Sequence, residues 1–518
     1  MDPQPTAPPC PFARGRPSWK AAAAVALLLV LGCGGPLSVS TQLPDAGTDA
    51  GADAGTDAGT DAGPPLDGGP LCAPDPPPDP RGTPQVTPGS GSLYLLRGRV
   101  VTPDVVLDPG EVLVNGATIA CVGSCGGTPA AAGATVIDTA GVIFPGLVDS
   151  HNHTQYDYLP AWRPSPPQLF QNRDQWPLRQ DYKDFVRSVN ANEGTYKCEQ
   201  VKYGEVVAML GGTTTMEGTY NTDLKCFRTL VHNAEHSELS STTRTNIGGI
   251  DSVTATAAAS LRADMLASPP KTTAYILHLG EGIDAKSEAE FGKLVAAGLL
   301  LPGTVIIHGT ALTAGDFAQM GAAGSKLVWS PQSNLILYGK TTNIPAALAA
   351  NVSVSLAPDW TLSGGPTLLQ ELKVARQHTC DNWPGLLDAR DLVKMVTAVP
   401  ADAMSVQSKV GRLAPGLLAD VLVIRDRGLD PYRALVEAQQ ADVRLVMIGG
   451  ILRYGDQALL DAAGRSGCES ITVCGESKRV CVPDTAAAST DKYNETLADI
   501  IAAVRGFQPG TQPLATCP

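Results

Sequence analysis

The sequence predicts an α/β fold, a (β/α)8 TIM-type barrel joined to a small β-sandwich whose strands come from both sides of the barrel. Three observations predict it. Apolar strand runs alternate with helical stretches through the middle of the chain. Short β-rich runs flank this middle on both sides. A chain of 518 residues, 43% of them hydrophobic, is also long and apolar enough for one large core.

Residues 1–33 are predicted to be a lipoprotein signal peptide. Basic residues precede an apolar run over residues 21–31, which is shorter than the roughly 20 residues that a membrane-spanning helix needs. The run ends in Val-Leu-Gly-Cys, which resembles the bacterial lipobox, so Cys33 is the expected lipidation site. We therefore expect an exported protein, lipid-anchored to a bacterial membrane of the cell envelope. A plain secretory signal with an incidental cysteine is the alternative.

Residues 34–90 are predicted to be a disordered linker. Asp-Ala-Gly units recur between residues 45 and 63, and a proline-rich stretch follows. Such a segment buries too little apolar surface to offset the entropy lost on ordering it. Its acids contribute to the net charge of -13, and the chain has no basic stripe and only 5% aromatic residues, so no nucleic-acid partner is expected.

The expected folded part has three regions. Residues 91–142 and 405–456 form the composite β-sandwich, because both contain short apolar runs broken by Gly, Pro and Asn. Residues 143–404 form the barrel. Residues 457–518 form a cysteine-containing C-terminal tail.

The cysteines suit an oxidising compartment, in which they form disulfides. Two local pairs are expected, Cys121 with Cys125 and Cys198 with Cys226. Four more crowd the tail and are positioned to staple it: Cys468, Cys474, Cys481 and Cys517. Their connectivity cannot be derived from the sequence.

The predicted barrel is one strand short of eight. Seven apolar strand candidates alternate with helical stretches such as residues 287–300 and 367–378. The candidates are residues 142–148, 213–216, 245–250, 274–279, 305–307, 327–329 and 352–356. The stretch between Glu217 and Ala274 is too long for the elements predicted in it, so the eighth strand is expected there.

A His-x-His motif follows the first of these strands. His151 and His153 are two residues apart, so on an extended strand both imidazoles point to one face. Catalytic groups of a barrel lie at the C-terminal ends of its strands, where the two rings can bind one metal ion. Two incidental histidines at a polar strand end are the alternative.

Four further polar residues lie in or just after strand candidates. His278 is near the end of one strand, with Glu281 three residues on, and His308 ends the next. Asp359 follows the last. This order of His-x-His, His-x-x-Glu, His and Asp at successive strand ends favours an active site over chance polarity.

The chain resembles the amidohydrolase superfamily, in particular its deaminase and chlorohydrolase branch. Four stretches within residues 93–454 carry the resemblance. They are the segment around His151 and His153, Gly-Thr-Thr-Thr at 212–215, the loop Ser-Pro-Gln-Ser-Asn-Leu at 330–335, and residues 410–420. The resemblance implies an enzyme that hydrolyses C–N bonds other than peptide bonds in a small-molecule substrate, by deaminating a heterocycle or opening a cyclic amide.

The resemblance also implies a role for each residue. One divalent metal, zinc or iron, is expected on four ligands: His151, His153, His278 and Asp359. Asp359 can also accept a proton from the attacking water. Glu281 is expected to shuttle a proton to the leaving nitrogen, and His308 to hydrogen-bond the attacked oxygen or the hydroxide as charge develops.

Some features leave alternatives open. Relatives with two metals use a carboxylated lysine on the fourth strand, and no lysine follows a clear strand there, which favours one metal. A dinuclear dipeptidase or imidase and a non-catalytic ligand-binding lipoprotein remain the competing hypotheses. Tyr156, Tyr158 and Trp360 are candidates for either pocket lining or packing. The substrate and the oligomeric state are not determined by the sequence.

A second histidine motif competes for a metal. His232-Asn233-Ala234-Glu235-His236 matches the His-x-x-Glu-His pattern of one metalloprotease class, in which both histidines share a helix face. The segment also fits a barrel helix with a solvated polar face, which is the reading we favour.

Overall fold

The computed structural model describes residues 71–74, 82–89, 91–218, 230–236, 239, 242–483 and 495–517, all within the compact unit Asp61–Pro518. The predicted signal peptide, its lipidation site Cys33 and most of the predicted linker lie outside the described residues. Within the described part of the chain, no helix has the length and apolar character needed to cross a membrane.

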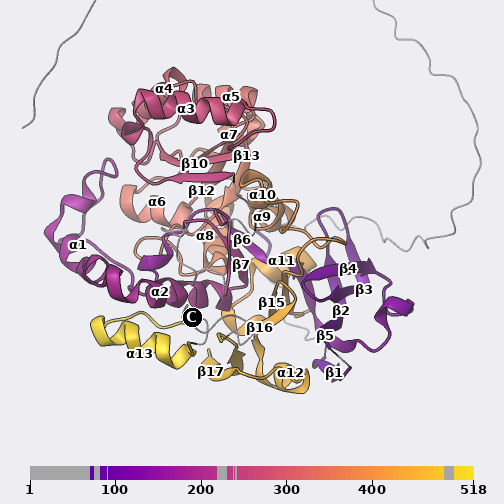
Figure 1. The fold of residues 1–518 in the computed structure, drawn as a ribbon. Coiled ribbons are helices and arrows are strands. Elements are labelled where there is room, and N and C mark those ends of the chain that lie inside the picture. The colour runs from indigo at the N-terminus through magenta and orange to yellow at the C-terminus, as the bar shows by residue number, and fades with distance from the viewer. Residues whose placement is uncertain are drawn as a thin grey trace, which may run out of the picture. The chain divides into compact units, whose positions relative to one another are not determined.

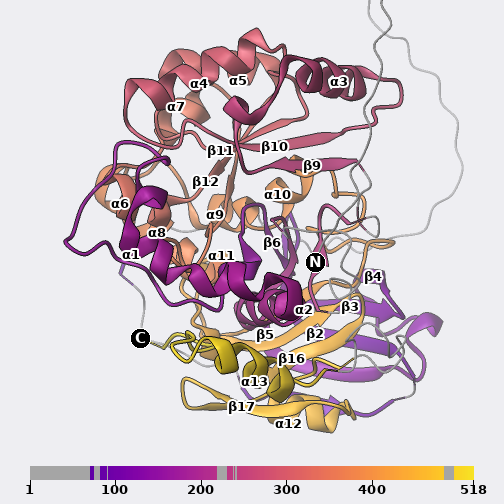
Figure 2. The same ribbon diagram turned by 60° about the vertical axis from the view of Figure 1, so that its left-hand side comes forward.

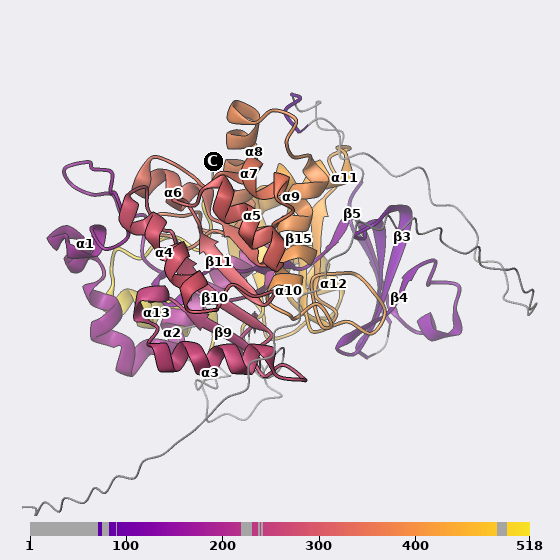
Figure 3. The same cartoon turned by 90° about the horizontal axis from the view of Figure 1, so that it is seen from above.

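One mixed sheet of ten strands joins the two ends of the described chain. Its N-terminal strands are β1 (Gln85–Thr87), β2 (Leu93–Val101), β3 (Val106–Asn115), β4 (Thr118–Gly123) and β5 (Thr135–Pro145). Its C-terminal strands are β14 (Val421–Arg425), β15 (Val443–Ile448), β16 (Ile451–Asp456), β17 (Glu469–Val473) and β18 (Glu476–Val480). The two sets meet where β5 pairs with β14, with Phe144 opposite Leu422. In Figure 3 the edge strand β4 and its neighbour β3 lie away from helices α4 to α7.

Two smaller sheets are entirely parallel. One contains β6 (Leu147–Asp149), β7 (Thr213–Met216) and β8 (His232–Asn233). The other contains β9 (Thr243–Asn246), β10 (Ala274–Leu279), β11 (Thr304–His308), β12 (Lys326–Trp329) and β13 (Ser353–Leu356). A parallel bridge between Asn152 and Asp359 joins the ends of β6 and β13. The described residues therefore contain eight parallel strands, in chain order around the two sheets.

Two details of the predicted strands were wrong. The strand missing from the sequence prediction is β8, which is only two residues long and polar, so it has no apolar run to reveal it. The predicted strand at residues 142–148 is two strands, because the chain leaves the ten-stranded sheet after Pro145 and enters the parallel sheet at Leu147. A Cβ on Gly146, between them, would lie 2.2 Å from Thr214 Oγ1, so only glycine fits this crossing.

Helices pack along the parallel strands. They are α3 (Ala255–Leu266), α4 (Ala285–Ala296), α5 (Ala314–Ala323), α6 (Pro331–Tyr338), α7 (Ile344–Ala349), α8 (Leu368–Asn382), α9 (Ala389–Met395) and α10 (Ala398–Ala403). Helix α11 (Pro431–Val436) packs instead against β2 and β14 of the ten-stranded sheet. Figures 1 and 2 show α3, α4, α5 and α7 together on one side of strands β9 to β12. The predicted helices at 287–300 and 367–378 correspond to α4 and α8. In α4, Asp284 caps the first turn, and Phe291 and Leu294 face the core.

The long connection from β6 to β7 contains α1 (Gln180–Phe185) and α2 (Arg187–Leu210). The C-terminal region contains α12 (Gln457–Ala462) and α13 (Leu497–Phe507), and α13 packs against α2, as Figure 1 shows. Phe507 of α13 lies edge-on to the buried ring of Tyr158, with ring centroids 5.6 Å apart. Tyr158 is therefore a packing residue.

Disulfides fasten the periphery of the fold. The predicted Cys121–Cys125 pair is present, and the tail contains Cys468–Cys481 and Cys474–Cys517. Cys198 is disulfide-bonded, and its predicted partner Cys226 lies outside the described residues. Cys72 bonds to Cys380 at the end of α8, a pairing that the sequence did not suggest.

Candidate active site

Six side chains converge at the C-terminal ends of four parallel strands. His151 and His153 follow β6, His278 and Glu281 come from the end of β10, His308 ends β11, and Asp359 follows β13. All are buried except His153, whose side chain is 16% exposed. The strand-end positions in the sequence thus correspond to one cluster in space.

The nitrogen and oxygen atoms of this cluster face one another. His151 Nε2 lies 3.0 Å from His278 Nε2 and 3.2 Å from Asp359 Oδ1, and His153 Nε2 lies 3.4 Å from the same oxygen. Three overlapping sets of residues each place their donor atoms within 4.8 Å of one another: His151, His153 and His278; His151, His308 and Asp359; His278, Glu281 and His308. This spacing suits one ion among the donors.

Burial favours the neutral form of His151 and His278. The pKa of His151 is well below its usual value, first because the ring is buried and then because His308, His278 and His153 surround it. The pKa of His278 is lowered in the same way, by burial and by His308, His153 and Arg173. A neutral imidazole is the form that binds metals, and three imidazoles with one carboxylate match the preferences of zinc and iron. The residues present therefore fit a divalent metal.

The backbone fixes two of the side chains in uncommon conformations. His308 and Asp359 have φ values of 68° and 74°, in the left-handed region that non-glycine residues seldom adopt. Asp359 is held by its neighbours across the strand ends, since its N–H donates to His151 O (3.1 Å) and its carbonyl accepts the His153 N–H (3.1 Å). The first and last of the parallel strands are thereby coupled directly through the site.

Helix α6 supports four of the six side chains. Ser330, which precedes the helix, lies 2.9 Å from His151 Nδ1 and does not cap the helix. Ser333 Oγ donates to Asp359 Oδ2 (2.6 Å), Asn334 Oδ1 lies 2.9 Å from His308 Nδ1, and Tyr338 Oη donates to Glu281 Oε1 (2.6 Å). The spacing of these residues is that of one helix face. Hydrogen bonds of this kind set the orientation of metal ligands and of acid–base groups.

From the sequence, residues 330–335 resemble a loop, whereas in the structure helix α6 begins at Pro331. The polar residues at positions 330, 333, 334 and 338, among apolar ones, were the available signal. The sequence could not show which site residue each of them contacts.

A cavity of about 460 Å³ opens from the cluster. Four aromatic residues in its lining are neighbours, Tyr156, Trp176, Tyr182 and Trp360, with ring centroids 4.9–5.6 Å apart. The lining also contains Ile247, a large apolar side chain that is 50% exposed, and the ion pair of Arg173 with Glu290 (3.2 Å). We name the four rings the aromatic wall. Tyr156 and Trp360 had been candidates from the sequence, whereas Trp176 and Tyr182 had not.

Residues 267–452 match the amidohydrolase family. The matched segment includes His278, Glu281, His308 and Asp359, and it begins after the His-x-His motif. The chain carries an amidohydrolase domain. It is an enzyme that hydrolyses carbon–nitrogen bonds.

Relatives of known name agree with this domain. The chain is 27% identical to a 5-methylthioadenosine/S-adenosylhomocysteine deaminase of Syntrophobacter fumaroxidans over 418 residues, which cover 71% of this chain and 94% of the relative. It is similar to the crystal structure of a zinc-bound adenosine deaminase from Xanthomonas campestris, with a TM-score of 0.56 and 19% identity, over 72% of this chain and 97% of that one.

A zinc complex of an atrazine chlorohydrolase from Arthrobacter aurescens gives a TM-score of 0.54 at 16% identity, over 69% of this chain and 94% of that one. These structural likenesses indicate a TIM-barrel-type α/β fold for the amidohydrolase domain.

The competing metalloprotease motif at residues 232–236 does not adopt the helix that it would need. His232 lies in β8, where a helix had been expected, so His232 and His236 do not share a helix face. His232 Nε2 lies 3.2 Å from Asp420 Oδ1, which also accepts the Gly449 N–H (2.8 Å). The motif belongs to the packing between β8 and the ten-stranded sheet.

Asp149, at the end of β6, stabilises the His-x-His segment through two hydrogen bonds. Its carboxyl accepts the His151 N–H (3.1 Å) and the Asn152 Nδ2–H (2.9 Å). Burial raises the pKa of Asp149 to about 7. Sequence reasoning gave this residue no role, although it lies two residues from the first histidine.

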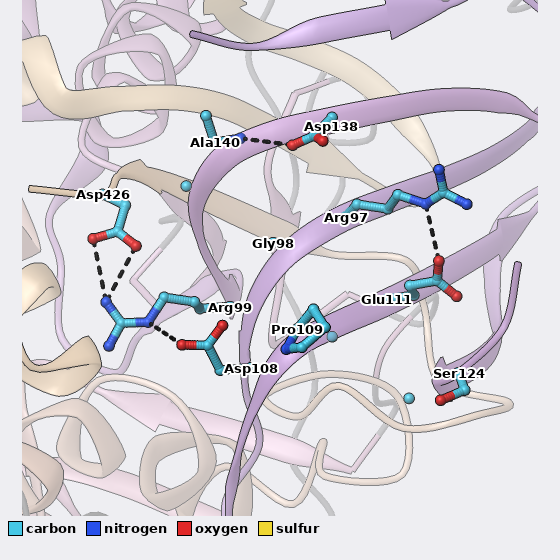
Figure 4. Close-up of a pocket in the computed structure, with 13 residues that line it drawn as sticks. Arg97, Gly98, Arg99, Asp108, Pro109, Glu111, Ser124, Asp138, Ala140 and Asp426 are labelled. Atoms are coloured by element: carbon cyan, nitrogen blue, oxygen red, sulfur yellow. Dashed lines mark hydrogen bonds and ion pairs between the residues drawn. The ribbon is translucent and has the colours of Figure 1, made fainter. Parts of the chain in front are cut away.

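A second cavity of about 540 Å³ lies in the ten-stranded sheet, away from the amidohydrolase site. Figure 4 shows Arg99 between Asp426 and Asp108, and Arg97 directed at Glu111. Glu111 also accepts the N–H groups of Cys125 and Gly126. Because both guanidinium groups are already paired, we assign no ligand to this cavity.

Proposed function

We propose that the protein is a mononuclear metal-dependent hydrolase that deaminates a heteroaromatic amine or opens a cyclic amide. The observation that carries the proposal is the convergence of three imidazoles and one carboxylate beside Glu281 and His308. The proposed ligands are His151, His153, His278 and Asp359, with zinc or iron as the ion. When bound, the ion acts as a Lewis acid that makes water nucleophilic near neutral pH.

The other side chains have the geometry for proton transfer and charge stabilisation. Glu281 lies beside His308, with Oε2 3.6 Å from Nε2, so the two can act together on one reacting centre. Glu281 takes a proton from the attacking water and moves it to the leaving nitrogen, with Asp359 as the alternative acceptor of that proton. His308 Nδ1–H donates to Asn334 Oδ1, which fixes the ring with Nε2 facing the site. Nε2 accepts from the attacking water in the neutral ring, and it donates to the developing oxyanion when both ring nitrogens carry a proton.

The aromatic wall supports a planar substrate. Four rings beside His153 offer stacking surface, and stacked or edge-on aromatic pairs contribute about 0.5–1.5 kcal/mol each beyond their buried area. Ile247 adds a further apolar side chain to the cavity lining. A heterocycle fits this space better than the extended backbone of a peptide.

The fourth parallel strand argues for one metal. β9 consists of Thr243–Asn246 and is followed by Ile247, so no lysine is present at its end. We further propose that the eight parallel strands form a closed (β/α)8 barrel, with the β-sandwich as its companion domain. We also propose that the chain is exported and anchored through lipid on Cys33, on the basis of the lipobox resemblance.

The function is tested by measuring product release from a panel of heteroaromatic amines, cyclic amides and dipeptides. We expect ammonia or ring-opened product from the first two classes, and none with Glu281→Gln. Turnover of dipeptides alone would favour the dinuclear hypothesis. Metal-loaded protein without turnover on any class would favour a ligand-binding protein.

A further inference from the structure

A chain of hydrogen bonds leads from the aromatic wall to Glu281. Trp176 Nε1 donates to Tyr338 Oη at 3.2 Å, and Tyr338 Oη donates to Glu281 Oε1 at 2.6 Å. Trp176 belongs to the connection between β6 and α1, and Tyr338 is the last residue of α6. Tyr338 is 2% exposed and Glu281 is 5% exposed, so water does not compete strongly for these bonds.

The direction of this chain follows from its first member. An indole nitrogen can only donate, so the Tyr338 oxygen must accept from Trp176 and its own proton must point to Glu281. Burial, together with the neighbouring Glu281 carboxylate, holds the pKa of Tyr338 well above its usual value, so the hydroxyl stays protonated. Oε1 of Glu281 therefore has a permanent donor.

The other oxygen, Oε2, does not accept this hydrogen bond and is available for proton transfer. It lies 3.6 Å from His308 Nε2, within the group of donor atoms that includes His278. We propose that Tyr338, oriented by Trp176, is a positioning residue that restricts the proton shuttle of Glu281 to Oε2. The inference rests on the proposed function of Glu281 as that shuttle.

The proton balance of this step is simple. As water attacks, a C–O bond forms and Glu281 Oε2 takes a proton from the water. As the C–N bond breaks, the same oxygen gives the proton to the leaving nitrogen. Glu281 is an ionised carboxylate at the start and at the end, and Tyr338 keeps its own proton throughout.

Tyr338 also ends α6, because Gly339 follows in the left-handed conformation with φ of 67°. A purely structural role therefore has to be separated from a positioning role. Tyr158→Phe is the matched control, since Tyr158 is also fully buried and its hydroxyl lies 3.1 Å from Ser188 Oγ, outside the cavity.

The kinetic test is a double-mutant cycle of Tyr338→Phe with Glu281→Gln. A hydrogen bond to a charged group is strong enough for Tyr338→Phe to lower kcat by about 10- to 100-fold, with KM unchanged. Adding Tyr338→Phe to Glu281→Gln should cause no further loss, because the two act as one unit. If the fold-loss of kcat in the double variant equalled the product of the two single losses, the positioning role would be overturned. An unchanged kcat in Tyr338→Phe would overturn it as well.

A second measurement does not depend on turnover. The indole N–H resonance of Trp176, assigned by its absence in Trp176→Phe, should shift in Tyr338→Phe and keep its position in Tyr158→Phe. An unmoved resonance in Tyr338→Phe would overturn the hydrogen-bond chain. A shifted resonance together with a wild-type protein that turns over no heterocycle would instead refute the proposed function, and with it the shuttle that Tyr338 is proposed to orient.

Discussion

Two buried clusters of polar side chains differ in how their charges are satisfied. In the ten-stranded sheet, Arg99 Nη1 donates to both carboxylate oxygens of Asp426, at 3.2 and 3.1 Å, and Asp108 lies 3.4 Å from Nε. At the ends of the parallel strands, His151 and His153 lie 3.2 and 3.4 Å from one Asp359 oxygen, and His278 Nε2 lies 3.0 Å from His151 Nε2. The first cluster joins opposite charges, whereas the second collects electron-pair donors.

This difference separates a structural role from a chemical one. The sheet cluster compensates its charges within the protein, so its contribution is to stability. The histidine cluster places electron-pair donors side by side without a cation among them, an arrangement that suits a divalent metal ion. Substitutions in the sheet cluster should therefore lower the free energy of unfolding, whereas substitutions in the histidine cluster should remove metal and activity.

The largest expected effect is the loss of metal and activity together. His151→Ala or Asp359→Ala removes a proposed ligand, so metal content should fall and turnover should drop to background. The measurements are elemental analysis and turnover on the same preparation. His378→Ala is the control, because His378 lies on α8 beside Trp383. Retained metal in both ligand variants would contradict the assigned ligand set.

The second effect separates metal binding from proton transfer. Glu281→Gln keeps the shape of the side chain but removes its proton transfer, so kcat should fall by about 10²- to 10⁴-fold. Metal content should remain that of the wild type. Normal turnover in this variant would show that the shuttle is another residue.

The third effect belongs to the sheet cluster. Arg99→Met leaves the buried Asp426 without its cation, which should lower the free energy of unfolding by about 3–5 kcal/mol. Arg97→Met is the control, because Arg97 is 46% exposed and its pair with Glu111 should contribute only about 0–1 kcal/mol. Urea unfolding measures both, and metal content should stay the same. Equal losses in the two variants would mean that burial does not set the strength of these pairs.

The last effect depends on pH and is the smallest when it is measured over a single pH unit. Glu371 of α8 accepts the Gln332 N–H, and burial raises its pKa from 4.5 to about 8. Between these values the unfolded chain releases a proton that the folded chain keeps, so this contribution to stability is complete below pH 4.5 and is lost as pH rises to 8. Each pH unit in this window corresponds to about 1.4 kcal/mol.

Glu371→Gln removes that titration, so stability should fall less between pH 5 and 8 in the variant than in the wild type. Comparing the two slopes cancels the effect of other buried acids. Parallel slopes would show that Glu371 is ionised in the folded protein.

The sequence predicted the histidine cluster better than its surroundings. His151, His278, His308 and Asp359 could be found because each lies at the end of an apolar run, and strand ends share one edge of a parallel arrangement. β8 could not be found, because two polar residues have no periodicity. Trp176 reaches the cavity only through the fold of a long connection, and no local pattern indicates that.

The central claim is that the histidine cluster holds one divalent metal. It is tested most directly by elemental analysis of the full chain, purified without added metal and again after incubation with zinc or iron. We expect about one ion per chain, lost in Asp359→Ala and retained in Glu281→Gln. Two ions per chain would contradict the mononuclear site, and none after incubation would contradict the metal site itself.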